Sequence, residues 1–143
     1  MWCIQPRTER TGKLYQKIAN YIDSKNGTCE VLAIPFAVFL NEDDINYFEP
    51  DISVICDLSK LDDKGCHGAP DWVIEIVSPG SKSRDYMTKL FKYRGAGVRE
   101  YWIVDPEKQR IMVYGFENNT VEQYDFGEDV PVGIYEGFSI CVP

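Results

Sequence analysis

One short stretch with apolar residues on both alternating faces is the feature that most restricts how this chain folds. It runs from Asp71 to Val77, and the only charged residue in its interior is Glu75. Successive side chains of a strand point to opposite faces, so this strand is expected in the middle of a sheet covered on both sides. An ionised carboxylate in such a place needs a counter-charge or a metal ion.

The rest of the chain predicts a mixed sheet with helices packed against it, in a single domain over residues 1–143. Helices are expected where apolar residues recur at three- and four-residue spacing, and strands where β-branched and aromatic residues alternate with polar ones. The expected elements are a helix over 11–24, strands over 29–40 and 51–57, a polar loop over 58–69, the strand over 71–77, a helix from Ser81 or Ser83 to about Gly95, a strand over 99–104, a hairpin of 110–116 with 120–126, and a last strand within 135–142. Within 29–40, Pro35 indicates a sheet edge or a bulge.

No segment predicts insertion into a membrane. The longest apolar run, Val31 to Leu40, is interrupted by Pro35 and is too short to span a bilayer. The first residues lack a basic region followed by an apolar stretch, so no signal peptide is expected. We therefore expect a cytoplasmic protein.

The five cysteines predict reduced thiols rather than a disulfide framework or a zinc site. Their number is odd, their spacings are wide, and no CxxC pair occurs. Cys66 and His67 are the only Cys/His neighbours, and they are expected in an ordinary glycine-rich loop because a zinc site needs about four ligands.

The net charge of −8 argues against a broad nucleic-acid-binding face. It does not exclude a nuclease, since a bound metal ion adds positive charge at the place where a phosphate sits.

Asp51 and Glu75 are the candidate metal ligands. Asp51 begins one expected strand and Glu75 lies in the next, so neighbouring strands would bring the two acids across a spacing of about 5 Å. Mg²⁺ prefers such a site, with one or two carboxylates, several waters and phosphate oxygens. Two simpler interpretations stay open: Asp51 as a turn residue after Pro50, and Glu75 as half of a buried ion pair with a helix lysine or arginine.

Asp85, Lys89 and Tyr93 are spaced at four-residue intervals and share one face of the expected helix. On a solvated face, Asp85 and Lys89 would form only a surface ion pair. If the face lies over the acids, Lys89 is placed to orient a water or to stabilise charge on a phosphate.

Four motifs in the chain resemble the Uma-two family of restriction endonucleases with a PD-(D/E)xK-like core. They are Glu49-Pro50-Asp51; Gly68-Ala69-Pro70-Asp71-Trp72-Val73-Ile74-Glu75-Ile76-Val77-Ser78-Pro79; Arg84-Asp85-Tyr86-Met87-Thr88-Lys89 with Tyr93; and Gly97-Val98-Arg99-Glu100-Tyr101-Trp102-Ile103-Val104-Asp105-Pro106. The resemblance extends from about residue 5 to the C-terminus and is most specific over 70–106.

The resemblance implies an α/β (α+β) restriction endonuclease-like fold: a mixed sheet flanked by helices, with a C-terminal β-hairpin extension. It also implies a bacterial protein that cleaves phosphodiester bonds of nucleic acid, expected to be DNA, with Mg²⁺ or Mn²⁺. Asp51 matches the first motif acid and Glu75 the second. The motif lysine would fall at Val77, so Lys89 is expected to replace it from the helix, with Asp85 and Tyr93 supporting the site.

Two departures from the family accompany this match. Its chains usually have a further N-terminal segment that forms a hairpin before the first helix, and often a histidine near the start of that helix. Here the start is Glu9-Arg10-Thr11-Gly12, and the only histidine is His67. A shorter N-terminus exposes a sheet edge, which a second copy in a homodimer is expected to cover.

Three functions therefore remain open on the sequence. The first is a metal-dependent nuclease. The second is a non-catalytic module on the same fold that binds nucleic acid or protein, which Val77 and the net charge favour. The third is a hydrolase of a small phosphorylated ligand, which would need less basic surface.

Overall fold

The computed structural model describes residues 6–41, 46–78 and 83–143. The elements are α1 (Pro6–Ser24), β1 (Glu30–Ala33), β2 (Val38–Phe39), β3 (Ile52–Ile55), a 3₁₀ helix η1 (Leu58–Lys60), β4 (Leu61–Asp62), β5 (Gly65–His67), β6 (Trp72–Ile76), α2 (Ser83–Ala96), β7 (Glu100–Asp105), β8 (Arg110–Gly115), β9 (Thr120–Asp125), β10 (Asp129–Pro131) and β11 (Ser139–Cys141). The expected cap Ser81 lies outside the described residues. None of the described helices is long and apolar enough to cross a membrane.

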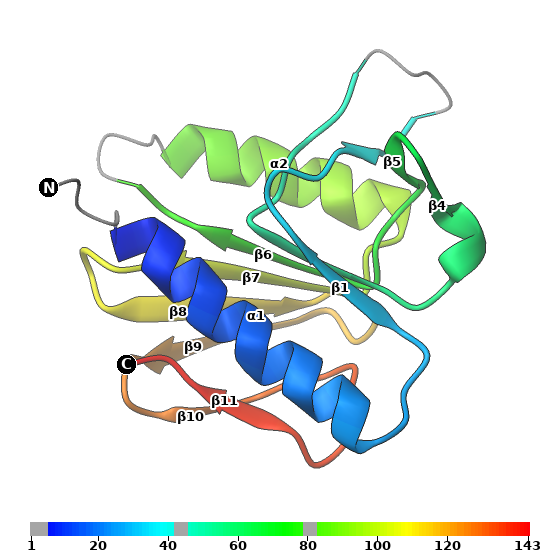
Figure 1. Cartoon of the computed structure of the whole chain (residues 1–143). Helices are drawn as coiled ribbons and strands as arrows, with labels where there is room; N and C mark the ends of the chain where they lie inside the picture. The colour runs from blue at the N-terminus through cyan, green and yellow to red at the C-terminus, as the bar shows by residue number, and fades with distance from the viewer. Residues whose placement is uncertain (1–5, 42–45, 79–82) are drawn as a thin grey trace, which may run out of the picture.

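The main sheet has six strands in the order β1-β3-β6-β7-β8-β9 (Figure 1). β6 and β7 are parallel and joined through α2, whereas the other neighbouring strands are antiparallel. The mixed α+β architecture is thus confirmed. β6 lies inside the sheet and is buried along its whole length, as its apolar pattern predicts.

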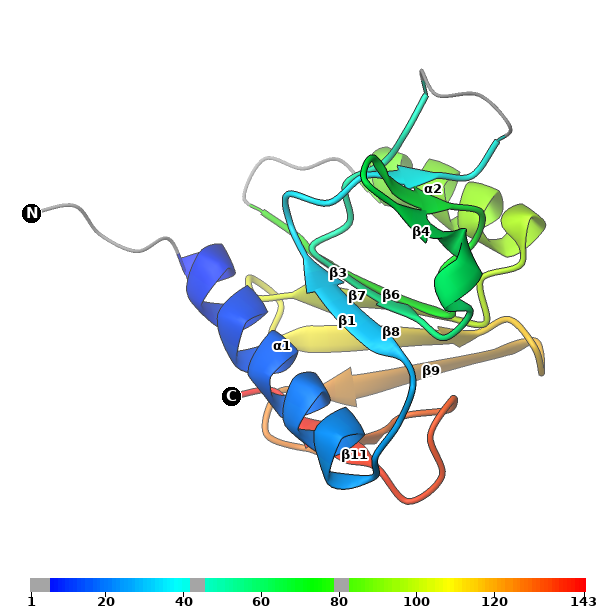
Figure 2. The same ribbon diagram turned by 45° about the vertical axis from the view of Figure 1, so that its right-hand side comes forward.

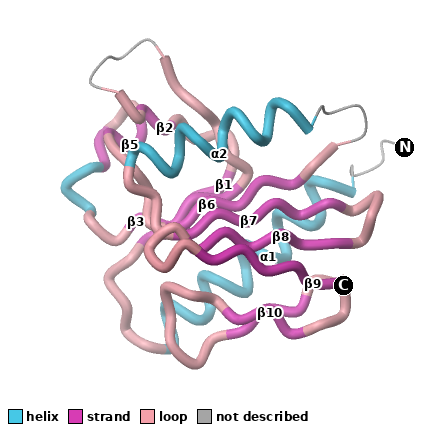
Figure 3. The backbone as a smooth tube through the Cα atoms, turned by 180° about the vertical axis from the view of Figure 1, so that it is seen from behind, coloured by secondary structure: helices cyan, strands magenta, loops and turns pink. Residues whose placement is uncertain are grey.

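The two faces of the sheet are covered by different helices. Figure 2 shows the strands between α1 and α2, and Figure 3 brings the α2 side into view. On the α1 side, Leu14, Ile18 and Ile22 pack against alternate strand residues such as Trp72 and Trp102. On the α2 side, the buried core residues are Ala69, Val73, Leu90, Tyr93, Val98 and Tyr101. The alternation of β6 therefore places Glu75 on the same side as α2.

The prediction of one strand over 29–40 is wrong in detail. β1 is an edge strand of the main sheet, as Pro35 indicates, but the strand ends at Ala33, just before a cis Ile34–Pro35 peptide bond. Val38 and Phe39 then form β2, which pairs with β5 in a separate sheet of order β2-β5-β4.

The prediction of a polar loop over 58–69 is also wrong. This segment forms η1, β4 and β5, and Cys66 is fully buried beside Val38. Gly65 permits the close approach of β5, because a Cβ atom there would lie 2.2 Å from the carbonyl oxygen of Ala37. Gly65 also has a φ of 146°, which glycine adopts readily.

At the C-terminal end, the hairpin of β8 and β9 is confirmed. The expected last strand is β11, but its partner is β10, which was not predicted. This two-stranded sheet packs on the α1 side, where Val130 and Ile140 from its strands, and Val132 and Val142 just after them, join the same core.

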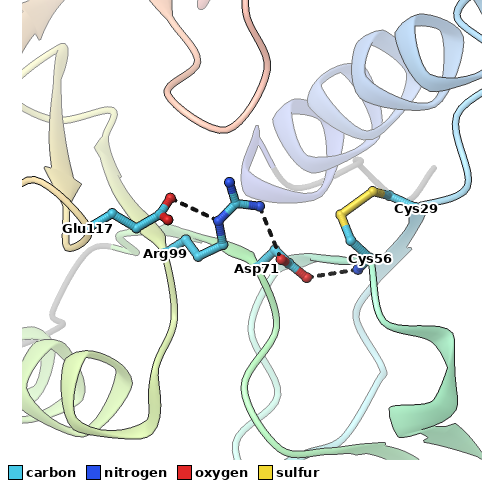
Figure 4. The surroundings of a disulfide bond; sticks show 5 residues. All are labelled: Cys29, Cys56, Asp71, Arg99 and Glu117. Carbon is cyan, nitrogen blue, oxygen red and sulfur yellow. Dashed lines mark hydrogen bonds and ion pairs between the residues drawn. A yellow bond between two sulfur atoms is a disulfide. The ribbon is translucent and has the colours of Figure 1, made fainter.

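The expectation that all cysteines are reduced is wrong for one pair, since the structure joins Cys29 and Cys56 in a disulfide (Figure 4). The antiparallel register pairs Glu30 with Ile55, so the next residues outward, Cys29 and Cys56, face each other across β1 and β3. Their separation of 27 residues gives no hint of this register. Cys66 and Cys141 are free thiols.

Candidate active site

Asp51 and Glu75 face each other across two adjacent strands. β3 and β6 are antiparallel with Ile52 opposite Ile74, so continuing the register sets Asp51 opposite Glu75. The two residues are only 5% and 3% exposed. The structure thus brings the two acids together, as the sequence predicts for neighbouring strands.

Hydrogen bonds link the two acids in both directions. The main-chain N–H of Ile76 donates to Oδ2 of Asp51 at 2.7 Å. The Glu75 carboxyl group has a hydrogen bond with the main chain of Asp51. Each acid is therefore oriented by the backbone of the other acid's strand, and the geometry of the pair follows from the strand register.

Burial dominates the electrostatics of Glu75. Removal from water raises the pKa of its carboxyl group, and the nearby charge of Asp51 raises it further. The charge of Lys89 and its hydrogen bond act in the opposite direction without cancelling the effect of burial. Burial therefore disfavours the ionised form of Glu75 even with Lys89 beside it.

Lys89 reaches this site from α2. Its Nζ lies 2.6 Å from Oε2 of Glu75, and its side chain is 30% exposed, so the ammonium group joins the buried acid to the surface. It also lies 5.5 Å from the centre of the Tyr86 ring. Val77, where the family motif has its lysine, is half-buried after the end of β6. A lysine from a different backbone position therefore meets the second motif acid.

The predicted helix face of Asp85, Lys89 and Tyr93 divides in the structure. Lys89 and Tyr93 face the sheet, and Tyr93 is completely buried. Burial raises the pKa of the Tyr93 hydroxyl, and the charges of Glu75 and Asp51 raise it further. Asp85 is exposed near the start of α2.

Two residues near the acids were not singled out from the sequence. Tyr101 in β7 is fully buried, and its hydroxyl also has a raised pKa, because of burial first and Glu75 second. Ser53, two residues after Asp51, is 1% exposed on the same face of β3. The two-residue period of strands indicates the face of each, but only the sheet order shows that they share one layer.

A third buried acid, Glu100, lies on the α1 side and does not belong to this site. Its carboxylate accepts hydrogen bonds from the indole N–H of Trp102 at 2.5 Å and from the main chain of Ile134 at 3.0 Å. It holds the segment before β11 against the core. In the part of the chain that the structure describes, no group of three or more His, Cys, Asp or Glu residues is arranged to hold a metal ion.

The mixed sheet flanked by helices matches a solved structure of nuclease-like fold. The chain belongs to the Uma-two family (Uma2), described as "Putative restriction endonuclease", whose profile matches residues 5–141. One similar solved structure is that of a "putative nuclease belonging to DUF820" from Anabaena variabilis ATCC 29413. Its TM-score is 0.72 at 20% sequence identity, and the match covers 93% of this chain and 75% of that one. No curated protein matches the chain.

Proposed function

We propose that this protein is a metal-dependent nuclease that hydrolyses phosphodiester bonds of nucleic acid, with DNA as the expected substrate. The observation that carries the proposal is the pair of facing carboxylates, Asp51 and Glu75, with one lysine ammonium 2.6 Å from Glu75. Membership of the Uma-two family supports the same chemistry.

The residues present fit a hard divalent cation. The donors are carboxylate oxygens, and burial together with the charge of Asp51 raises the pKa of Glu75, so a cation between the two acids would stabilise their ionised forms. Mg²⁺ binds well to one or two carboxylates when water and phosphate oxygens complete its ligands. The lack of a third acid among the described residues is compatible with such a site.

Each residue then has a distinct role. When bound, Mg²⁺ or Mn²⁺ would supply Lewis-acid chemistry, polarising the phosphate and lowering the pKa of an attacking water. Asp51 and Glu75 would hold the ion, and the N–H of Ile76 keeps the Asp51 carboxylate turned toward β6. Lys89 stabilises negative charge that develops on the phosphate or orients the attacking water. Asp85 is exposed and would act through Lys89, one turn further along α2.

The test compares cleavage of single- and double-stranded DNA by wild type, Asp51→Asn and Lys89→Met, with Mg²⁺, with Mn²⁺ and with EDTA. Loss of a preorganised charged donor costs roughly 100-fold in rate, so Lys89→Met should be slower by about that factor. Lys92→Met is the matched control, because Lys92 is on the same helix but exposed. Equal cleavage by Lys89→Met and wild type would refute the role given to Lys89.

The second candidate is a non-catalytic module that binds nucleic acid or protein on the same fold. It is favoured by Val77, which stands where the nuclease motif has its lysine, and by the net charge of −8. The Lys89–Glu75 ion pair also fits this candidate, because such a pair can stabilise the fold without taking part in catalysis. DNA binding without cleavage under any metal would select this candidate. Cleavage of small phosphodiesters but not of DNA would instead indicate a small-ligand hydrolase.

We further propose a homodimer in the cytoplasm. The edge strands of the main sheet are β1 and β9, and an exposed edge is a common site for pairing with a second copy. Light scattering tests the dimer. The cytoplasm keeps thiols reduced, so the Cys29–Cys56 bond should be open there and close in air after purification. A bond found intact by mass spectrometry after trapping thiols in cells would contradict the cytoplasmic location.

A further inference from the structure

Two tyrosine side chains lie in the layer between the sheet and α2, the layer that also contains the acidic pair. Tyr93 comes from α2, one turn after Lys89, and Tyr101 comes from β7, the strand beside β6. Their ring centres are 5.1 Å apart, and both side chains are completely buried. The two tyrosines therefore reach this layer from a helix and from a strand.

Both hydroxyls are close enough to Glu75 to be affected by its charge. The negative carboxylate contributes to the raised pKa of Tyr93 and of Tyr101, and Asp51 contributes to that of Tyr93. A tyrosine with a raised pKa keeps its proton at neutral pH, so each hydroxyl remains a hydrogen-bond donor next to negative charge.

Neither hydroxyl bonds to a protein group among residues 6–41, 46–78 and 83–143. The same holds for the hydroxyl of Ser53, which lies in the same layer because β3 pairs Ser53 with Val73 and β6 pairs Val73 with Tyr101. Buried polar groups are nearly always hydrogen-bonded, to ordered water where protein offers no partner. Three such hydroxyls in the layer of the acids indicate a site that holds water.

We infer that Tyr93 and Tyr101 are positioning residues, whose hydroxyls donate hydrogen bonds to the water molecules around a divalent ion held by Asp51 and Glu75. This inference rests on the proposed function. Mg²⁺ gives up its waters reluctantly and keeps several of them in proteins. Donors that orient the groups around a metal strengthen its binding, and their loss typically weakens the affinity by 10-fold or more.

The rings have a separate, structural role. Tyr93 packs against Phe48, and Tyr101 packs against Tyr114 and Phe116. Phenylalanine keeps these ring contacts and removes only the oxygen. Tyr93→Phe and Tyr101→Phe therefore test the hydroxyls without opening a cavity.

Tyr135→Phe is the matched control. The Tyr135 hydroxyl is also buried without a protein partner in the described part of the chain, but its ring packs on the α1 side against Tyr21 and Phe138. The same chemical change is thus made on the opposite side of the sheet from the acids.

The experiment measures Mn²⁺ affinity by isothermal titration calorimetry for wild type, Asp51→Asn and the three phenylalanine variants, and the melting temperature of each in EDTA. We expect Asp51→Asn to lose binding, and Tyr93→Phe and Tyr101→Phe each to bind Mn²⁺ roughly 10-fold more weakly. Tyr135→Phe should bind like wild type. In EDTA, the Tyr93 and Tyr101 variants should melt at the wild-type temperature or above it.

Two sets of results would overturn the inference, and they are distinguishable. If wild type binds Mn²⁺ through Asp51 but the Tyr93 and Tyr101 variants bind as tightly, the metal site stands and the tyrosines do not serve it. The same conclusion follows if Tyr135→Phe is weakened equally, or if the two variants melt well below wild type in EDTA. If wild type binds no Mn²⁺, both the metal site and the role of its hydroxyls are refuted.

Discussion

Reduction of the Cys29–Cys56 bond should lower the free energy of unfolding by an amount that follows from the loop it closes. The two cysteines are 27 residues apart, and the loop between them contains β1, β2, Asp51 and β3. In the chain-entropy treatment, a cross-link over such a loop restricts the unfolded chain enough to contribute about 3.5 kcal/mol at 25 °C. For a chain of this length, that corresponds to a fall in melting temperature of roughly 10 °C.

The assay is urea unfolding of oxidised protein with and without dithiothreitol, followed by tryptophan fluorescence. Trp72 and Trp102 are fully buried in the core, so unfolding should change their emission. The control is the double variant Cys29→Ala/Cys56→Ala, which should unfold near the reduced wild type and ignore the reductant. Cys66 and Cys141 remain in that variant, so any effect of dithiothreitol through them would be visible.

Two outcomes would contradict this reasoning. If mass spectrometry shows the bond formed but reduction leaves the urea midpoint unchanged, the loop does not restrict the unfolded chain as argued. If purified protein in air never forms the bond, the sulfur atoms of Cys29 and Cys56 do not meet as the structure places them, and the expected stabilisation is absent.

Two further predictions concern the buried acids Glu75 and Glu100. Because burial raises the native pKa of Glu75, wild type loses stability as pH rises from the ordinary carboxyl value of about 4.3 through the raised one. Glu75→Gln in EDTA should therefore melt at the wild-type temperature or above it at pH 7, and should show no advantage near pH 4. The partly exposed ammonium group of Lys89 can be hydrated by solvent once its partner is neutral. A large loss of stability at pH 7 would instead mean that Glu75 and Lys89 form a structural ion pair. Glu100→Gln should lose about 1–3 kcal/mol, since an amide NH₂ would face the N–H of Trp102 or Ile134. Urea midpoints check this, with exposed Glu107→Gln as the control, and equal midpoints would show that the two N–H groups find other acceptors.

Much of the site could be predicted from local patterns. Alternation in 51–57 and 71–77 set Asp51 and Glu75 on definite strand faces, and four-residue spacing set Lys89 and Tyr93 on one helix face. Those periods are properties of the backbone and need no knowledge of neighbours. The prediction of a loop over 58–69 is wrong because strands of two or three residues are too short to show a period. β4 and β5 form because β5 pairs with both β4 and β2.

The sequence by itself determined the mixed architecture, the central position of β6 and the face on which each acid stands. Only the tertiary structure decided that Asp51 is opposite Glu75, that Lys89 reaches the acid, that Cys29 meets Cys56, and that Tyr101 joins the layer of the site. The physical reason is register. A shift of one residue between β3 and β6, or a different crossing of α2 over the sheet, would keep every local pattern and separate these side chains, because contacts between distant segments depend on the packing of the whole core.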